Sequence, residues 1–140
     1  MPSDRTLRWS AFGFAVFFAL VVALGYIPMA NAGAEHVEMT GMGEHKMFGL
    51  YMIGAADDVT HGLSALLFLI AAATSARASR LALAAFGWYY AIDAAIYLIT
   101  GVIQHRPFVS NILLNLPHVV ISGLMLWLAY SGRREVSEAR

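Results

Sequence analysis

The stretch that decides the fold is L-A-L-A-A-F-G-W-Y-Y-A-I-D-A-A-I-Y-L-I-T-G-V-I, residues 81–103. A membrane-spanning helix needs about 20 consecutive, mostly apolar residues. This run reaches that length with a single charged side chain, Asp93. It therefore predicts a helix that crosses a bilayer, with one acid inside it.

Three further runs of similar character flank this one, and the predicted spans are residues 9–29, 58–76, 81–103 and 111–130. The whole chain is 59% hydrophobic and 13% charged, about half the charge of a typical soluble domain. The connections after the second and third runs are short, which forces neighbouring helices to lie antiparallel. The sequence predicts an all-α integral membrane protein, an up-down bundle of four helices in a single domain.

The first run resembles a secretory signal in its flanks. Arg5 and Arg8 precede it, and the small-residue pattern A-N-A follows at residues 30–32. A signal peptide has an apolar core of roughly 7–15 residues, however, and this run is longer. We therefore expect a true span.

The basic residues predict the orientation of the spans. Arginines lie before the first span, between the second and third, and after the fourth: Arg5, Arg8, Arg77, Arg80, Arg133, Arg134 and Arg140. Only Lys46 and Arg106 fall in the other two connections. By the positive-inside rule, both termini face the cytoplasm, and we expect a multi-pass protein of the bacterial cytoplasmic (inner) membrane.

The connection between the first two spans faces outward in this topology. Its second half, residues 47–56, is apolar but too short to span, so we expect an outer interfacial or re-entrant helix, or an extension of the second span. Asp57 and Asp58 favour a helix start at the outer interface, since acids stabilise helix N-termini. The polar half mixes imidazoles and thioethers, which suit copper, so a metal site is one interpretation and a solvated loop is the other. Its candidate ligands are His36, Met39, Met42 and His45.

Several classes of function are excluded by composition. The chain has no cysteine, so it forms no disulfide and no thiolate metal site. Its formal net charge is zero and it has no basic patch, so no nucleic-acid partner is expected. It contains neither a Gly-rich phosphate loop nor a serine elbow. We therefore predict no catalytic residues and a protein that is not an enzyme.

Four polar residues inside the predicted spans form the candidate site: His61, Asp93, Asn115 and His118. At about 1.5 Å of rise per residue, the acid and both histidines fall in the outer half of the bilayer. A carboxylate there costs at least about 3 kcal/mol and normally pairs with other polar groups. We expect Asp93 to hydrogen-bond to a histidine or to Asn115. The simplest alternative is that these residues only hold helices together.

A short internal echo links two of the spans. D-V-T-H at residues 58–61 and N-L-P-H at residues 115–118 align on their histidines, in spans that run in the same direction. The chain is therefore a candidate tandem repeat of a two-helix unit.

These motifs resemble the small four-span bacterial membrane proteins grouped as domain of unknown function 4383. The family pattern has a G-L-F-like approach segment, an N-x-x-H, a tyrosine in the third span and a second N-x-x-H. The corresponding residues here are Gly49-Leu50-Tyr51, Asp58 to His61, Tyr90 or Tyr97, and Asn115 to His118. The resemblance covers roughly residues 12–130 and implies the topology, but no activity, since the family has none established. Asp58 and Asp93 depart from the pattern.

The leading hypothesis is a small non-enzymatic accessory or scaffolding subunit that packs against a larger membrane complex or against itself. One alternative is a membrane protein that binds a metal or a tetrapyrrole, haem or a chlorophyll-type pigment, through His61 and His118. A third hypothesis is proton or small-solute translocation involving Asp93.

Overall fold

A computed structural model describes residues 2–27, 45–47 and 51–131 of the chain. Four helices account for most of these residues: α1 Asp4–Gly25, α2 Ala55–Thr74, α3 Ala76–Ile103 and α4 Phe108–Tyr130. All four are long and apolar enough to cross a membrane. The predicted all-α class is confirmed, and the protein is a multi-pass membrane protein whose apolar helices contact lipid.

The helix starts differ from the predicted spans because local capping, not hydropathy, decides them. Ser3 Oγ accepts the backbone N–H of Thr6 at 3.0 Å, so α1 begins five residues before the predicted start at residue 9. Asp57 Oδ2 accepts the N–H of Gly54 at 2.9 Å, which sets the start of α2. Pro107 directly precedes α4, which begins at Phe108 instead of residue 111.

The chain separates into two compact units, Phe12–Leu69 and a second unit made of Met1–Ala11 with Ile70–Arg140. The second unit contains all of α3 and α4, the end of α2 and the start of α1. The first unit contains the rest of α1 and α2 with the strands between them. Each unit is described separately below.

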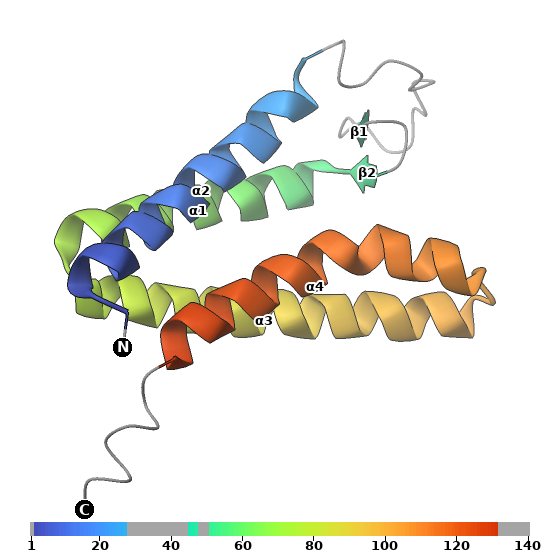
Figure 1. Ribbon diagram of the computed structural model, residues 1–140. Coiled ribbons are helices and arrows are strands. Elements are labelled where there is room, and N and C mark those ends of the chain that lie inside the picture. The colour runs from blue at the N-terminus through green and yellow to red at the C-terminus, as the bar shows by residue number, and fades with distance from the viewer. Residues whose placement is uncertain (1, 28–44, 48–50, 132–140) are drawn as a thin grey trace, which may run out of the picture. The chain divides into compact units, whose positions relative to one another are not determined.

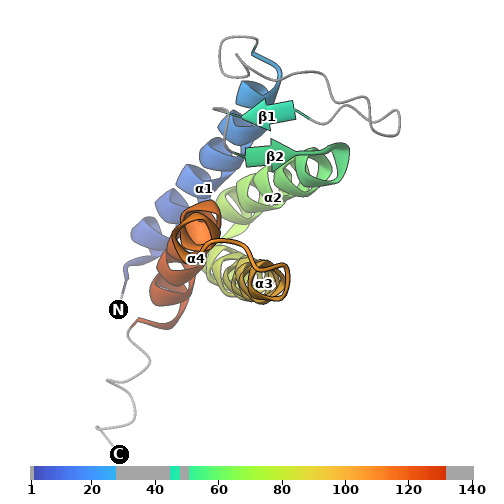
Figure 2. The same ribbon diagram turned by 90° about the vertical axis from the view of Figure 1, so that its right-hand side faces the viewer.

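In the second unit, α3 and α4 form an antiparallel hairpin and lie side by side in both views (Figures 1 and 2). The buried positions of α3 include Leu83, Gly87, Tyr90, Ala94 and Gly101, which recur mostly at intervals of three, four or seven. This spacing places one continuous stripe of α3 against its partner, as in coiled-coil packing.

Two glycines let the helices of the hairpin approach each other closely. A Cβ on Gly87 would lie 2.9 Å from Leu126 Cδ2 of α4, and a Cβ on Gly101 would overlap the side-chain amide of Asn111. Small residues at helix contacts are the usual device of membrane bundles, because association there depends on van der Waals packing. The register of the hairpin, and thus of its polar residues, follows from these two contacts.

The turn between α3 and α4 is a Schellman motif with a histidine at the left-handed position. The N–H of His105 donates to Val102 O at 3.0 Å, and the N–H of Arg106 donates to Gly101 O at 2.9 Å. His105 has φ 54°, where glycine is the usual residue.

We expect His105→Gly to stabilise the hairpin by about 1 kcal/mol. Glycine adopts the left-handed conformation without the steric cost that a side chain adds. The measurement is the free energy of unfolding of the full chain in mixed micelles. His105→Ala is the control, since it removes the imidazole but keeps the strained backbone. Equal stabilisation by both variants would assign the effect to the imidazole instead.

The connection between α2 and α3 is Ser75 alone, which caps α3 by accepting the N–H of Ala78 at 3.1 Å. Arg8 of α1 donates from Nε to the carbonyl of Ala72 at 2.8 Å, and from Nη2 to that of Ala73 at 3.4 Å. These carbonyls belong to the last turn of α2, so no later N–H of the helix donates to them. The C-terminal end of a helix also favours a positive charge nearby. The guanidinium of Arg8 in α1 therefore supplies hydrogen-bond donors to the C-terminal end of α2.

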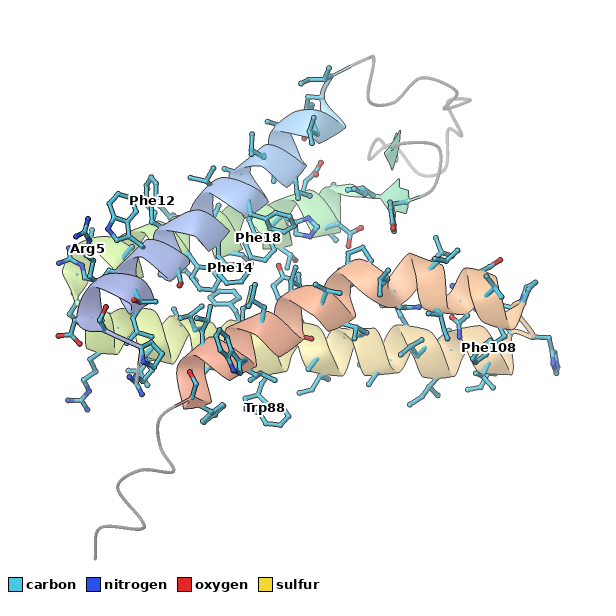
Figure 3. The ribbon with its side chains drawn as sticks, viewed as in Figure 1. Arg5, Phe12, Phe14, Phe18, Trp88 and Phe108 are labelled. Carbon is cyan, nitrogen blue, oxygen red and sulfur yellow. The ribbon has the colours of Figure 1, made fainter. Side chains whose placement is uncertain are left out.

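In the first unit, aromatic side chains connect α1 and α2. The ring centroid of Phe14 lies 5.6 Å from that of Phe68, and Phe18 lies 6.1 Å from Phe68 and 5.7 Å from His61. Figure 3 shows Phe14 and Phe18 on one side of α1 and Phe12 on the opposite side. The contact between these two helices is thus made by large rings, whereas glycines make the contact between α3 and α4.

The segment before α2 is partly extended, which corrects the expectation of a helix over residues 47–56. Strands β1 His45–Met47 and β2 Tyr51–Ile53 pair antiparallel, with Lys46 opposite Met52 (Figure 2). An extended β2 so close to Gly54 also excludes a continuous helix from residue 47 into α2. Pairing between the strands provides hydrogen-bond partners for their backbone N–H and C=O groups. An apolar pattern alone does not show whether a helix or a strand provides these partners.

Candidate functional site

The candidate site lies along the face of α4 that packs against α3. Four polar side chains share this face at intervals of four, three and four residues: Asn111, Asn115, His118 and Ser122. Three of the four are buried, and the side chain of His118 is 28% exposed. This row, together with Asp93, Tyr90 and Tyr97 of α3, is called the polar seam below.

The two asparagines fix the end of the seam near the turn. Asn111 Nδ2 donates to the carbonyl of Leu98 on α3 at 3.0 Å. Asn115 Nδ2 donates to the carbonyl of Asn111 at 2.7 Å and lies 3.4 Å from its Oδ1. The amide of Asn111 therefore bonds across the helices, while Asn115 bonds along its own helix and supports it. The prediction that Asn115 belongs to the polar group agrees with this position.

Asp93 and His118 meet at the middle of the seam. His118 Nε2 lies 3.8 Å from Asp93 Oδ2, and the two side chains are 28% and 31% exposed. The distance suits an ion pair or a bridging water better than a direct hydrogen bond. Two of the predicted site residues, Asp93 and His118, are thus brought together as an ion pair.

Aromatic rings of α3 orient the imidazole of His118. Its ring is nearly parallel to Tyr90 at a centroid distance of 5.8 Å and to Tyr97 at 6.4 Å. Tyr90 is 2% exposed and anchors the contact. His118 Nδ1 is buried and has no hydrogen-bond partner among the described residues. The imidazole is therefore held by its faces, with Nε2 directed at the acid.

Asp93 and His118 lie at the same distance from the turn between their helices. His118 follows Phe108, the first residue of α4, by ten positions, and Asp93 precedes Ile103, the last residue of α3, by ten. At about 1.5 Å per residue, both lie about 15 Å from the turn, half the thickness of a bilayer core. For His118 this distance is greater than the sequence indicated, because α4 begins at Phe108 and not at residue 111, whereas α3 ends at the predicted residue 103.

His61 belongs to the first unit, where its ring stacks on Phe18 at an interplanar angle of 19°. It lies in the second turn of α2, close to the helix start. Each histidine of the internal echo therefore stacks on an aromatic ring of the preceding helix, His61 on Phe18 and His118 on Tyr90. This likeness favours the tandem repeat, which remains a prediction.

Asp57 and Asp58 lie in the first turn of α2, where the sequence analysis places a helix start. Asp57 caps the helix through Gly54, and Asp58 Oδ2 accepts the hydroxyl of Tyr26 at 3.1 Å. This hydrogen bond and the negative charge of Asp58 raise the pKa of Tyr26, so the phenol stays protonated. The two acids therefore hold the start of α2 and connect it to the end of α1.

The predicted metal ligands His36, Met39 and Met42 lie outside the described residues. His45 belongs to β1, where only its backbone is described. Within residues 2–27, 45–47 and 51–131, no three side chains from His, Asp and Glu converge as a metal site would require.

The seam favours a paired role for His118 over ligation of a tetrapyrrole. An axial ligand presents one ring nitrogen to an open space that a flat macrocycle can occupy. Here Nε2 is directed at Asp93, and the ring packs against two tyrosines. Chemically, an acid and an imidazole at this distance can form an ion pair or bind a polar group from another helix.

Comparisons with known proteins find no match for this chain among family models, curated proteins or solved structures. The resemblance to domain of unknown function 4383 therefore remains a prediction, and the proposals below depend on the geometry of the molecule.

Sequence reasoning missed Asn111 and the tyrosine contacts of His118. Asn111 sits at the edge of the predicted fourth span and was not grouped with the polar residues. Its signal is the spacing of residues 111, 115, 118 and 122, which places four polar side chains on one helical face. The sequence resemblance pointed to Tyr90 or Tyr97, but it did not indicate that both rings contact His118.

Proposed function

We propose that the protein is a small non-enzymatic accessory or scaffolding subunit that associates within the membrane with a larger complex or with a second copy of itself. The observation that carries this proposal is the partial exposure of Asp93 and His118 at the middle of spanning helices. The comparisons neither support nor oppose this function.

The physical basis is the cost of a partly exposed polar pair within spanning helices. Ionisable residues at this depth cost at least about 3 kcal/mol on insertion scales and usually face protein or a water-filled cavity. The side chain of His118 stays 28% exposed and that of Asp93 31% exposed. A polar side chain from a neighbouring helix would cover the exposed part and hydrogen-bond to it.

The rest of the hairpin suits a scaffold. The glycine contacts and the Asn111 hydrogen bond hold α3 and α4 in one register, so the pair is presented on a preorganised surface. Exposed apolar side chains surround it, among them Ile92, Ile96 and Val119. A partner helix would therefore meet a polar centre within an apolar rim, as in many interfaces.

We expect Asp93→Asn and His118→Gln to weaken association about tenfold each, because each removes one member of the pair from the contact. The measurement is cross-linking in native membranes, followed by native mass spectrometry of the extracted complex. A complex must exceed the 15.2 kDa of one chain. Asp4→Asn is the matched control, since Asp4 is an exposed acid in the first turn of α1 and should leave association unchanged.

A wild-type chain that stays a single 15.2 kDa species both in native membranes and in vesicles would contradict the proposal. A complex that is equally stable in Asp93→Asn, His118→Gln and the control would keep association but remove the pair from its interface.

A second function, proton or small-solute translocation, is favoured by the same partly exposed acid at mid-depth. It predicts a flux in vesicles that falls at least tenfold in Asp93→Asn, because the amide neither binds nor releases a proton. The measurement is the decay of an imposed pH gradient in proteoliposomes. A flux unaffected by Asp93→Asn would count against this function, and association without flux would favour the subunit.

A further inference from the structure

The turn between α3 and α4 borders an open groove of about 420 Å³. Its apolar walls are Leu98, Ile99, Val102 and Ile103 of α3 with Phe108 and Ile112 of α4. The volume falls within the range of about 300–1,000 Å³ that ligand sites occupy. The Asp93–His118 pair lies about 15 Å from the turn, beyond the far end of this groove at Leu98 and Ile112.

The groove offers contact area to an apolar ligand, but it offers almost no hydrogen-bonding groups to a polar one. Val102, Ile103 and Phe108 are 67%, 70% and 77% exposed, and Figure 3 shows Phe108 at the turn end of α4. Asn111 is the polar residue of the lining, and its amide is engaged by the carbonyl of Leu98 within the hairpin. When a helix pair spans a membrane, the apolar groups that can enter such a groove are lipid acyl chains.

The turn beside the groove carries a positive charge, Arg106, which forms no ion pair among the described residues and donates from Nη2 to Gln104 Oε1 at 3.3 Å. Arg106 is the single formally charged side chain between Asp93 and the end of α4, and His105 adjoins it. The backbone of Arg106 is held by its hydrogen bond to Gly101 O, so the residue stays next to Ile103 and Phe108. A guanidinium at the end of a spanning hairpin matches the depth and charge of a phosphate headgroup.

We propose that this groove binds one acyl chain of an anionic phospholipid, whose headgroup phosphate binds Arg106. The net charge of the turn selects an anionic headgroup over a zwitterionic one, since the cationic group of the latter would find no acid there. The proposal is independent of the accessory function, because it concerns a different part of the hairpin and needs only one chain.

The test is native mass spectrometry of the full chain in detergent. Phosphatidylglycerol or phosphatidylcholine with the same acyl chains is added in titration. We expect the phosphatidylglycerol adduct to form at about tenfold lower lipid concentration, the effect of one charge-assisted contact. Arg106→Gln should abolish that difference. Arg77→Gln removes an exposed arginine at the other end of α3 and should preserve it.

A second pair of variants tests the groove itself. Val102→Trp places a large ring in the groove and should lower adduct formation with both lipids. Leu81→Trp, at an exposed position of α3 outside the lining, is the matched control and should leave it unchanged. Both sites are exposed, so folding is retained, and the free energy of unfolding in micelles verifies this.

Equal affinity for the two lipids, or an adduct insensitive to Arg106→Gln, would overturn the proposal of an anionic ligand. Adducts that are unchanged in Val102→Trp would overturn the groove as the site. Loss of binding in Val102→Trp with retention in Leu81→Trp, together with loss of headgroup selectivity in Arg106→Gln alone, is the result that supports it.

Discussion

Replacing Gly101 with alanine is expected to destabilise the protein by about 3 kcal/mol. The new Cβ would overlap the side-chain amide of Asn111, which must then leave its place. The displaced amide loses its hydrogen bond to the carbonyl of Leu98 at a buried position, where water does not readily replace it. Overpacking and an unsatisfied polar group each cost about 1–3 kcal/mol.

The chain offers a matched control in Gly123 of α4, where an added Cβ meets nothing within 4 Å. Gly123→Ala should be neutral or stabilise by up to about 1 kcal/mol, since alanine is the better helix former. The measurement for both variants is the free energy of unfolding in mixed micelles or by steric trapping in bicelles.

A double-mutant cycle identifies the cause. In Gly101→Ala with Asn111→Ala, the overlap is gone, so the double variant should be no less stable than Asn111→Ala alone. If the two losses simply add, the amide of Asn111 is not what the glycine accommodates, and the close contact described here is wrong.

The second large effect is expected from Phe18→Ala, a loss of about 2 kcal/mol. Phe18 is fully buried and contacts Phe14, Phe68 and His61. A Phe→Ala change costs about 3–5 kcal/mol in a soluble core, but part of that is transfer from water, which is absent between helices in lipid. What remains is the lost packing around the cavity.

Phe12 is the control on the same helix, since it is 41% exposed and lies on the opposite side of α1 (Figure 3). Phe12→Ala should change stability by less than about 0.5 kcal/mol, because lipid replaces the contacts of the ring. Unfolding of both variants is measured in the same bicelles. Equal losses would show that the ring cluster does not connect α1 and α2.

Much of the fold follows from residues that act locally. Four apolar runs predicted four helices, because a spanning segment must satisfy its own backbone hydrogen bonds. Asp57 and Asp58 marked the start of α2 because acids stabilise helix N-termini. The helix starts were displaced where capping extended a helix past its apolar run, as Ser3 does for α1. The strands β1 and β2 were missed because a short apolar run has no decisive period.

For the candidate site, too, one part could be predicted from the sequence and another depends on the tertiary structure. The presence of Asp93 and His118 inside apolar runs was enough to predict that polar groups must meet within the protein, since lipid offers them no partner. Which groups meet was decided by the register of α3 and α4, and that register depends on Gly87 and Gly101. Helical periodicity assigns a residue to a face of its own helix, but says nothing about the height at which a second helix packs. The pairing of Asp93 with His118, the rings of Tyr90 and Tyr97 around it and the hydrogen bond of Asn111 to Leu98 are therefore properties of the tertiary structure alone.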